Sequence, residues 1–142
     1  MKNRLSTDDL FLIIENIDDL EKTWDNLTPH MNAQSFKEYL YELMEQRGFD
    51  AGKLGMKALL SRSFAYQICS GERQPSRDII FRIAVAMRLN ADETQQLLRL
   101  AHHGTLYPRD KRDAVIIYAL SQGLDLYETD ELLAKMEQQT LL

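Results

Sequence analysis

Apolar residues recur at three- and four-residue spacing along most of the 142-residue chain, which is the spacing of one face of an α-helix. The intervals between these segments contain Gly, Pro or a good helix-capping residue, and the whole chain has only 6 Gly and 3 Pro. No segment has a convincing strand pattern, and no repeat or low-complexity stretch interrupts the series. The sequence therefore predicts an all-α fold.

We expect eight helical segments from this spacing. The first covers residues 7–26 and is followed by a joint at residues 27–34. Its acidic face lies opposite an apolar face made of Leu10, Ile13, Ile14, Ile17 and Leu20. Four helices are expected to begin at residues that favour the N-cap position, which are Ser35, Asp50, Ser61 and Ser76, and Asn90 or Ala91 is expected to open a fifth. Three of them are expected to end at Gly48, Gly71 and Gly104, and the last two helices follow Pro108 and are separated by Gly123.

Charge is distributed unevenly along the chain. The formal net charge is −5, yet residues 1–34 and residues 89–142 each carry −4, whereas residues 35–88 carry nine basic and six acidic side chains, a net +3. The acidic total argues against a general nucleic-acid coat protein. A basic middle segment can still bind phosphate groups locally, so residues 35–88 are candidates for contact with nucleic acid.

Residues that carry chemistry are sparse. Cys69 is the only cysteine, so we expect neither an intramolecular disulfide nor a zinc site, and we interpret it as a small core residue rather than a redox switch. His102 and His103 are adjacent, so their side chains diverge by about 100° and cannot clamp one metal ion; we interpret them as helix C-terminal residues. No catalytic motif is present. We expect no enzyme activity, no cofactor and no metal, in a cytoplasmic protein that does not span a membrane.

Residues 50–70 have the pattern of two short helices joined by a tight turn, an arrangement that can place its second helix in the major groove of DNA. The positions of the second helix expected to face the core are Ala65, Ile68 and Cys69. The positions expected to face outward are Arg62, Ser63, Tyr66 and Gln67. Arg can bond guanine, Gln can bond adenine, and a Ser hydroxyl can donate or accept. Arg73 and Arg77 are expected beside the groove, where they would pair with phosphates, as would the helix starts near Asp50 and Ser76.

The stretch from Ser35 to about Leu98 resembles the five-helix DNA-binding domain of lambda-repressor-like, Xre-type bacterial regulators. The residues that carry the resemblance are Leu54-Gly55, Leu60-Ser61-Arg62, Ile68, Gly71, Pro75-Ser76, Ala84 and Leu89. The segment at residues 106–136 also looks like the C-terminal helical pair of a group of Xre-type proteins of Gram-positive bacteria. This second likeness implies that the last two helices belong to the same folded unit.

The resemblance implies a set of base-reading residues, namely Arg62, Ser63, Tyr66 and Gln67. Phe64 is implied to touch a thymine methyl group or a sugar, and the alternative for Phe64 and Tyr66 is a partly buried aromatic ring. Two positions depart from the family pattern. Ala51 stands where many members have a polar, phosphate-bonding residue, and its side chain cannot make that contact. Cys69 replaces a common glutamate and lacks the charge for the local salt bridge that the glutamate makes.

We divide the chain into an acidic amphipathic arm (1–34), a helix-turn-helix DNA-binding domain (35–104) and a C-terminal helical extension packed on the same unit (105–142). We expect a sequence-specific transcription regulator, a repressor in particular, that binds double-stranded DNA as a homodimer. The alternative is a protein-interaction adaptor or antitoxin-like module that uses the helical bundle and the acidic helix. For that helix, packing on the bundle, contact with a partner or second copy, and shielding of the basic surface all remain open. The sequence identifies no small-molecule effector.

Overall fold

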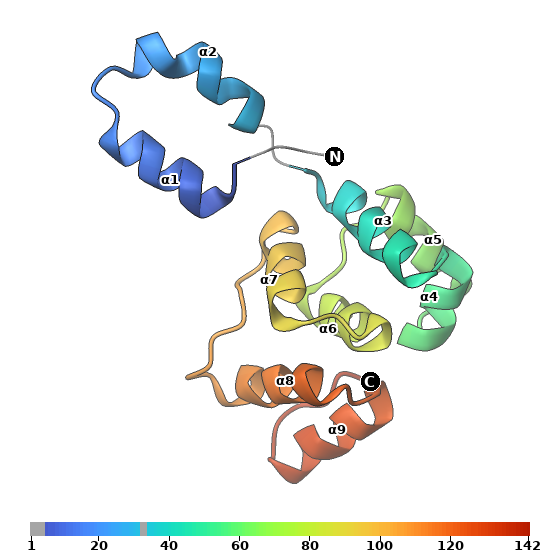
Figure 1. The fold of residues 1–142 in the computed structure, drawn as a ribbon. Helices are drawn as coiled ribbons and strands as arrows, with labels where there is room; N and C mark the ends of the chain where they lie inside the picture. The colour runs from blue at the N-terminus through green and yellow to red at the C-terminus, as the bar shows by residue number, and fades with distance from the viewer. Residues whose placement is uncertain (1–4, 32–33) are drawn as a thin grey trace. The chain divides into compact units, whose positions relative to one another are not determined.

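The computed structural model of the protein describes residues 5–31 and 34–142. Over these residues the chain forms nine α-helices and no strand, which confirms the expected all-α class (Figure 1). The chain divides into two compact units, a first that ends at Gln34 and a second that runs from Ser35 to Leu142. No helix of the described residues has both the length and the apolar character needed to cross a membrane.

The first unit contains two helices where the sequence predicted one. Helix α1 spans Thr7–Asn16 and α2 spans Leu20–Met31, so the prediction of a single helix over residues 7–26 is wrong. The backbone leaves the helical conformation at Ile17, where φ is −78° and ψ is 147°. The Asp19 carboxylate then accepts a hydrogen bond from the amide three residues later at 3.3 Å. The preference of aspartate for helix starts therefore breaks a helix that the apolar spacing alone would continue.

The joint expected at residues 27–34 is shorter than predicted, because α2 continues to Met31. Pro29 lies in the last turn of α2, where its missing amide removes one backbone hydrogen bond from a helix that is about to end. Residues 32–33 of the expected joint lie outside the described residues.

The second unit follows the predicted helix starts closely. Its helices are α3 (Phe36–Arg47), α4 (Ala51–Ala58), α5 (Arg62–Ser70), α6 (Arg77–Met87), α7 (Ala91–Leu100), α8 (Lys111–Gln122) and α9 (Leu126–Lys135). The predicted N-caps each accept a hydrogen bond from the amide three residues on, which confirms Ser35, Asp50, Ser61, Ser76 and Asn90. Left-handed glycines follow three of the helices, with φ of 69° at Gly48, 87° at Gly71 and 65° at Gly123.

The end of α7 differs from the prediction. The helix stops at Leu100 rather than at Gly104, and the left-handed residue beyond it is His102, with φ of 61°. His103 turns back toward the loop before α6, and its Nε2 atom lies 2.8 Å from the carbonyl oxygen of Pro75. The two histidines therefore lie just past the helix, where one shapes the turn and the other holds a neighbouring loop.

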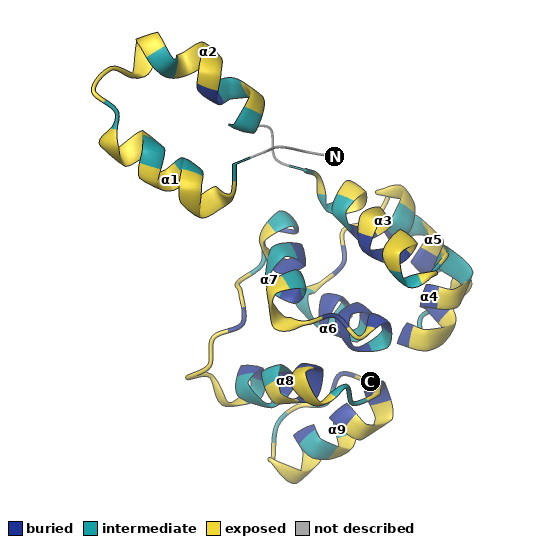
Figure 2. Cartoon of the chain, in the orientation of Figure 1, coloured by how far each residue is buried: buried dark blue, intermediate teal, exposed yellow. Residues whose placement is uncertain are grey.

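Helix α6 is the centre of the second unit. Figure 2 shows it buried along most of its length, and it contacts α4, α7, α8 and α9. Its buried residues are Ile80, Phe81, Ile83, Ala84, Val85 and Met87. Burial of such aliphatic and aromatic side chains is the main favourable contribution to folding, at roughly 1.5 to 3 kcal/mol for each large side chain. The packing around α6 therefore holds the surface helices α4 and α5 in place.

The last two helices belong to this same unit. Arg112 at the start of α8 donates two hydrogen bonds to the carboxylate of Asp78 in α6, at 2.7 and 3.0 Å. The C-terminal end is tied down by Asp130 of α9, whose carboxylate oxygens accept hydrogen bonds from the amides of Leu141 at 2.6 Å and Leu142 at 2.9 Å. The first contact therefore holds α8 on α6, and the second holds the C-terminal tail on α9.

Candidate nucleic-acid interface

Helices α4 and α5 are joined by a turn of three residues, Leu59 to Ser61. Leu59 adopts a left-handed conformation, with φ of 58°, and the Leu60 amide donates to the carbonyl oxygen of Gly55 at 2.8 Å. Gly55 is buried against α5: a Cβ atom added there would lie 3.2 Å from the Cβ of Ala65 and 3.3 Å from the Leu60 carbonyl oxygen. The absence of a side chain at this glycine lets α4 brace α5 at close range.

Helix α5 has one buried face and one exposed face. Ala65 and Ile68 are fully buried, as predicted, whereas Cys69 is only half-buried. On the opposite side the predicted base-reading residues are accessible: Arg62, Ser63 and Tyr66 are exposed and Gln67 is partly exposed. The structure thus presents all four on one surface, which we call the α5 face.

Arg73, in the loop after α5, lies against this face. Its Nε atom donates to Oε1 of Gln67 at 2.9 Å, and its guanidinium carbon lies 5.4 Å from the centre of the Phe64 ring. Phe64 is half-buried, and the Arg62 guanidinium lies 5.8 Å from the ring of Tyr66. Such cation–π contacts hold both arginines near the helix without removing their charge.

Arg77 has a different position from the one expected of a phosphate contact. Its guanidinium donates to both carboxylate oxygens of Asp113, at 3.0 and 2.8 Å, and to the carbonyl oxygens of Gly104 and Thr105, at 2.9 and 3.0 Å. It also lies 4.9 Å from the ring of Phe81. These internal partners occupy the guanidinium and join α6 to α8 and the loop before it, which is not the arrangement that the sequence predicted for a phosphate contact.

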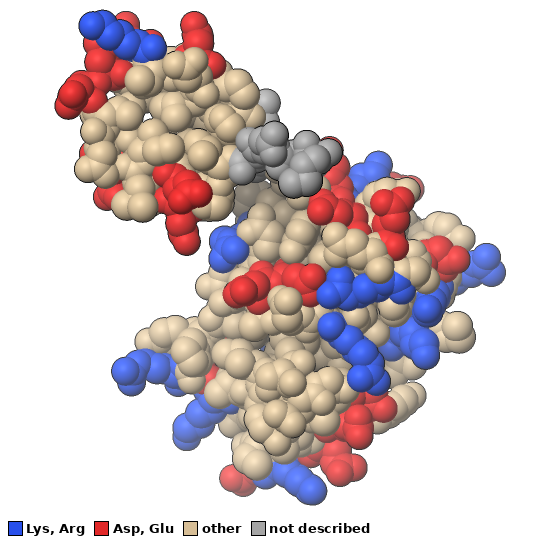
Figure 3. Space-filling model, viewed as in Figure 1, with Lys and Arg blue, Asp and Glu red and all other residues tan. Residues whose placement is uncertain are grey.

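Further exposed lysines lie on α3 and α4, next to α5, and the sequence did not predict them as individual site residues. Figure 3 shows basic side chains gathered over α4 and α5, where Lys53 and Lys57 are exposed. Lys37 of α3 is also exposed and reaches the end of α5, since its Cδ atom would lie 3.5 Å from a Cβ atom on Gly71. The only sequence signal for these lysines was the net +3 of residues 35–88.

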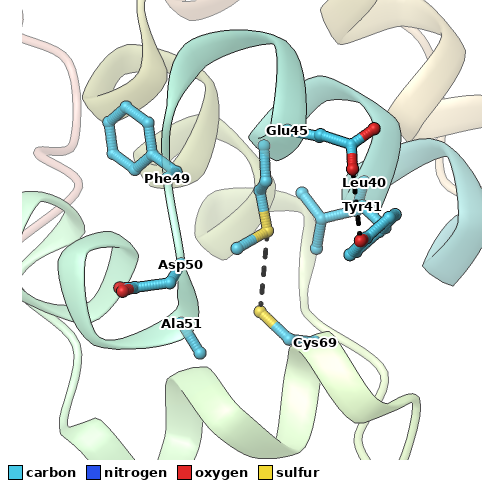
Figure 4. Close-up of a pocket in the computed structure, with 8 residues that line it drawn as sticks. Leu40, Tyr41, Glu45, Phe49, Asp50, Ala51 and Cys69 are labelled. Carbon is cyan, nitrogen blue, oxygen red and sulfur yellow. Dashed lines mark hydrogen bonds between the residues drawn. The ribbon is translucent and has the colours of Figure 1, made fainter.

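A small cavity of about 280 Å³ lies behind α5, between α3 and the start of α4 (Figure 4). Leu40, Phe49 and Ala51 contribute apolar walls, and the Cys69 sulfur lies 3.8 Å from the Met44 sulfur. Burial raises the pKa of the Cys69 thiol, so the group stays protonated at neutral pH. The cavity explains why Cys69, expected in the core, is only half-buried.

No family model, curated protein or solved structure matches the chain. The resemblance to Xre-type regulators therefore stays a prediction from the sequence. Among residues 5–31 and 34–142, no group of three or more His, Cys, Asp or Glu side chains is arranged to hold a metal ion.

Proposed function

We propose that the protein is a sequence-specific DNA-binding transcription regulator of the Xre type, with α4 and α5 as its helix-turn-helix. The observation that carries the proposal is the α5 face, a row of exposed polar side chains on a short helix that Gly55 allows α4 to brace. A helix that enters the major groove needs this combination of a fixed inner face and a polar outer face. The lambda-repressor-like arrangement of α3 to α7 is part of the same proposal.

Each residue of the α5 face has a role in this proposal. Arg62 is suited to guanine and Gln67 to adenine, while Ser63 and Tyr66 supply hydroxyl groups that donate or accept. Before Gln67 can use its carbonyl oxygen on a base, Arg73 must release it. The released guanidinium is then free to pair with a phosphate beside the groove.

The half-buried Phe64 lies at the edge of the same surface and would contact a thymine methyl group. Exposed lysines, which are Lys37, Lys53 and Lys57, would add phosphate contacts that do not depend on sequence. The acidic ends of the chain oppose general adhesion to DNA, so binding would depend on the orientation of the basic segment.

A single α5 face covers only a few base pairs, so we propose that the protein acts as a homodimer. Two such faces about 34 Å apart would bind successive major grooves on one side of the duplex. The linked second contact would add affinity without any new type of interaction. A repressor of this kind would act by occupying DNA that polymerase needs.

Selection from random DNA duplexes with the full-length chain, followed by sequencing, tests the proposal. We expect enrichment of a palindromic site with half-sites one helical turn apart. An Arg62→Ala/Gln67→Ala variant should lose the enrichment, whereas Arg109→Ala, at an exposed position in the loop before α8, should keep it. Absence of any enriched site at low salt, with the protein folded, would contradict the proposed function.

A further inference from the structure

The first unit has almost no core of its own. Within residues 5–31 only Leu27 is buried, although both helices carry large apolar side chains. The exposed ones have between 43% and 64% of their surface accessible, and they are Phe11, Leu12, Ile14, Leu20 and Trp24. Folded units of fewer than about 40 residues rarely stand without a disulfide, a metal or a partner. An apolar surface this concentrated on two short helices is typical of a site that another molecule covers.

The charge on these helices is strongly of one sign. Residues 5–31 carry seven acidic side chains and one basic side chain, Lys22, a net −6. The ion pairs of the described chain, which join Arg47 to Glu93, Arg77 to Asp113, Arg112 to Asp78 and Lys135 to Glu131, all lie in the second unit. Figure 3 accordingly shows mainly acidic groups on the charged part of the first unit. Among residues 5–31, therefore, no ion pair offsets the negative charge of these carboxylates.

We propose that the first unit is a docking surface for a basic amphipathic helix of a partner protein. In α2 the exposed Leu20 and Trp24 lie four residues apart, so they share one helical face, next to the buried Leu27. A partner helix can lay an apolar stripe on such a face, and its Lys and Arg side chains can reach the flanking carboxylates. This inference goes beyond DNA binding and does not depend on it.

A second copy of the unit or a membrane surface fits the negative charge of these helices less well than a basic helix does. A second copy of the unit, residues 1–34, would bring a net −4 against another −4, which costs free energy wherever the contacts are close. An anionic membrane surface would repel the unit for the same reason. A basic helix is the occupant that offsets both the exposed apolar area and the carboxylates.

The experiment uses the full-length chain and the fluorescence of Trp24, which is its only tryptophan. The probe is a synthetic amphipathic helix of Leu and Lys, compared with a matched helix of Leu and Glu. We expect the Leu/Lys peptide to shift the Trp24 emission to shorter wavelength in a saturable titration that weakens with salt. The Leu/Glu peptide should bind at least about ten-fold more weakly.

Two variants separate the apolar from the electrostatic part. The double variant Phe11→Ser/Leu12→Ser removes apolar surface but keeps Trp24 and every charge. The double variant Glu15→Gln/Asp25→Asn removes two negative charges but keeps every apolar side chain. Each variant should weaken binding of the Leu/Lys peptide about ten-fold. Tyr127→Ser, an equally exposed aromatic position in the second unit, is the matched control and should change nothing.

Three results would overturn the inference. The first is equal binding of the two peptides. The second is a Trp24 emission that is already at short wavelength in the dilute free chain, which would mean that the chain covers its own surface. The third is a shift that appears with protein concentration alone, which would make a second copy the occupant. Loss of DNA binding in any of these variants would leave the inference standing, because the peptide titration does not depend on DNA.

Discussion

Arg77 and Asp113 form a two-point ion pair that joins the first turn of α6 to the first turn of α8. The guanidinium nitrogens lie 3.0 and 2.8 Å from the two carboxylate oxygens, and the Asp113 side chain is only 4% exposed. Arg112 and Asp78, the chain neighbours of Asp113 and Arg77, form a second pair between the same helices with the charges reversed. The two pairs fasten the C-terminal helices to the part of the unit that carries α5.

Arg77→Ala should lower the free energy of unfolding by about 3 to 5 kcal/mol, because it leaves the buried carboxylate of Asp113 without its main partner. Urea unfolding followed by circular dichroism measures the change. The control is Arg109→Ala, because Arg109 is exposed in the loop before α8. Its free energy of unfolding should stay within about 0.5 kcal/mol of the wild-type value. Equal losses for the two variants would mean that the ion pair contributes nothing specific.

Stability should also fall in acid through Asp113. Burial by itself would raise the pKa of Asp113, but the hydrogen bonds from Arg77 and the Tyr107 amide and the charges of Arg77 and Arg112 together lower that pKa below its ordinary value. A carboxyl group of this kind stabilises the fold at pH values above its unfolded-state pKa of about 4. The stabilisation is lost as the pH falls through the lower folded-state pKa.

Urea unfolding between pH 7 and pH 2.5 tests this directly. We expect the Asp113 contribution to be constant above about pH 5 and to fall progressively as the pH drops below about 4. Asp113→Asn should be less stable at neutral pH, and its disadvantage should shrink in acid. Parallel curves for the two proteins over the whole range would show that the carboxylate charge plays no part.

Two glycines of α4 should respond in opposite directions to a side chain. Gly55→Val places methyl groups against Ala65 and the Leu60 carbonyl, so we expect a loss of about 1 to 3 kcal/mol. Gly52→Ala adds a Cβ atom at an ordinary 3.5 Å from the Asp50 carboxylate, so we expect a gain of up to about 1 kcal/mol from helix propensity. Thermal unfolding of both variants measures the difference, and a stabilised Gly55→Val would contradict the close packing of α4 on α5.

Arg62 and Arg73 should differ in how they affect DNA binding. Arg62→Ala should cost about 1 to 3 kcal/mol on the preferred site and relax the preference at one base step. Arg73→Ala should weaken binding to all sequences alike, as loss of a phosphate contact does. Titrations against the selected site and a scrambled duplex separate the two effects, and the same uniform loss in both variants would rule out base reading by Arg62.

Cys69 should react slowly with alkylating reagents. Its thiol is half-buried, and burial raises its pKa, so little of the reactive thiolate is present near pH 8. Iodoacetamide modification followed by mass spectrometry should be at least about ten-fold slower than for glutathione, and urea should restore the rate. Modification of the folded protein as fast as that of glutathione would show that the thiol is open to solvent.

Helix starts in the second unit could be predicted because an N-cap acts over three residues. Ser35 and Asn90 satisfy the first free amides of their helices wherever those helices later pack. The break between α1 and α2 could not be told in this way, because Ile13, Ile17 and Leu20 keep a helical spacing across it. There the local preference of Asp19 for a helix start outweighs the apolar periodicity, which by itself predicts one continuous helix.

Charged partners were harder to predict than helices. Arg73 and Arg77 stand close together in the chain and have the same side chain, so the sequence favoured one role for both. Asp113 lies 36 residues beyond Arg77 in the chain, and the hydrogen bonds to its carboxylate give Arg77 a different position from that of Arg73. The order and capping of the helices follow from neighbouring residues, because backbone hydrogen bonds and apolar spacing act within a turn or two. Which arginine lies against the α5 face and which pairs with a buried carboxylate depends on the distant segments that fold beside each one, and only the packed structure brings those segments together.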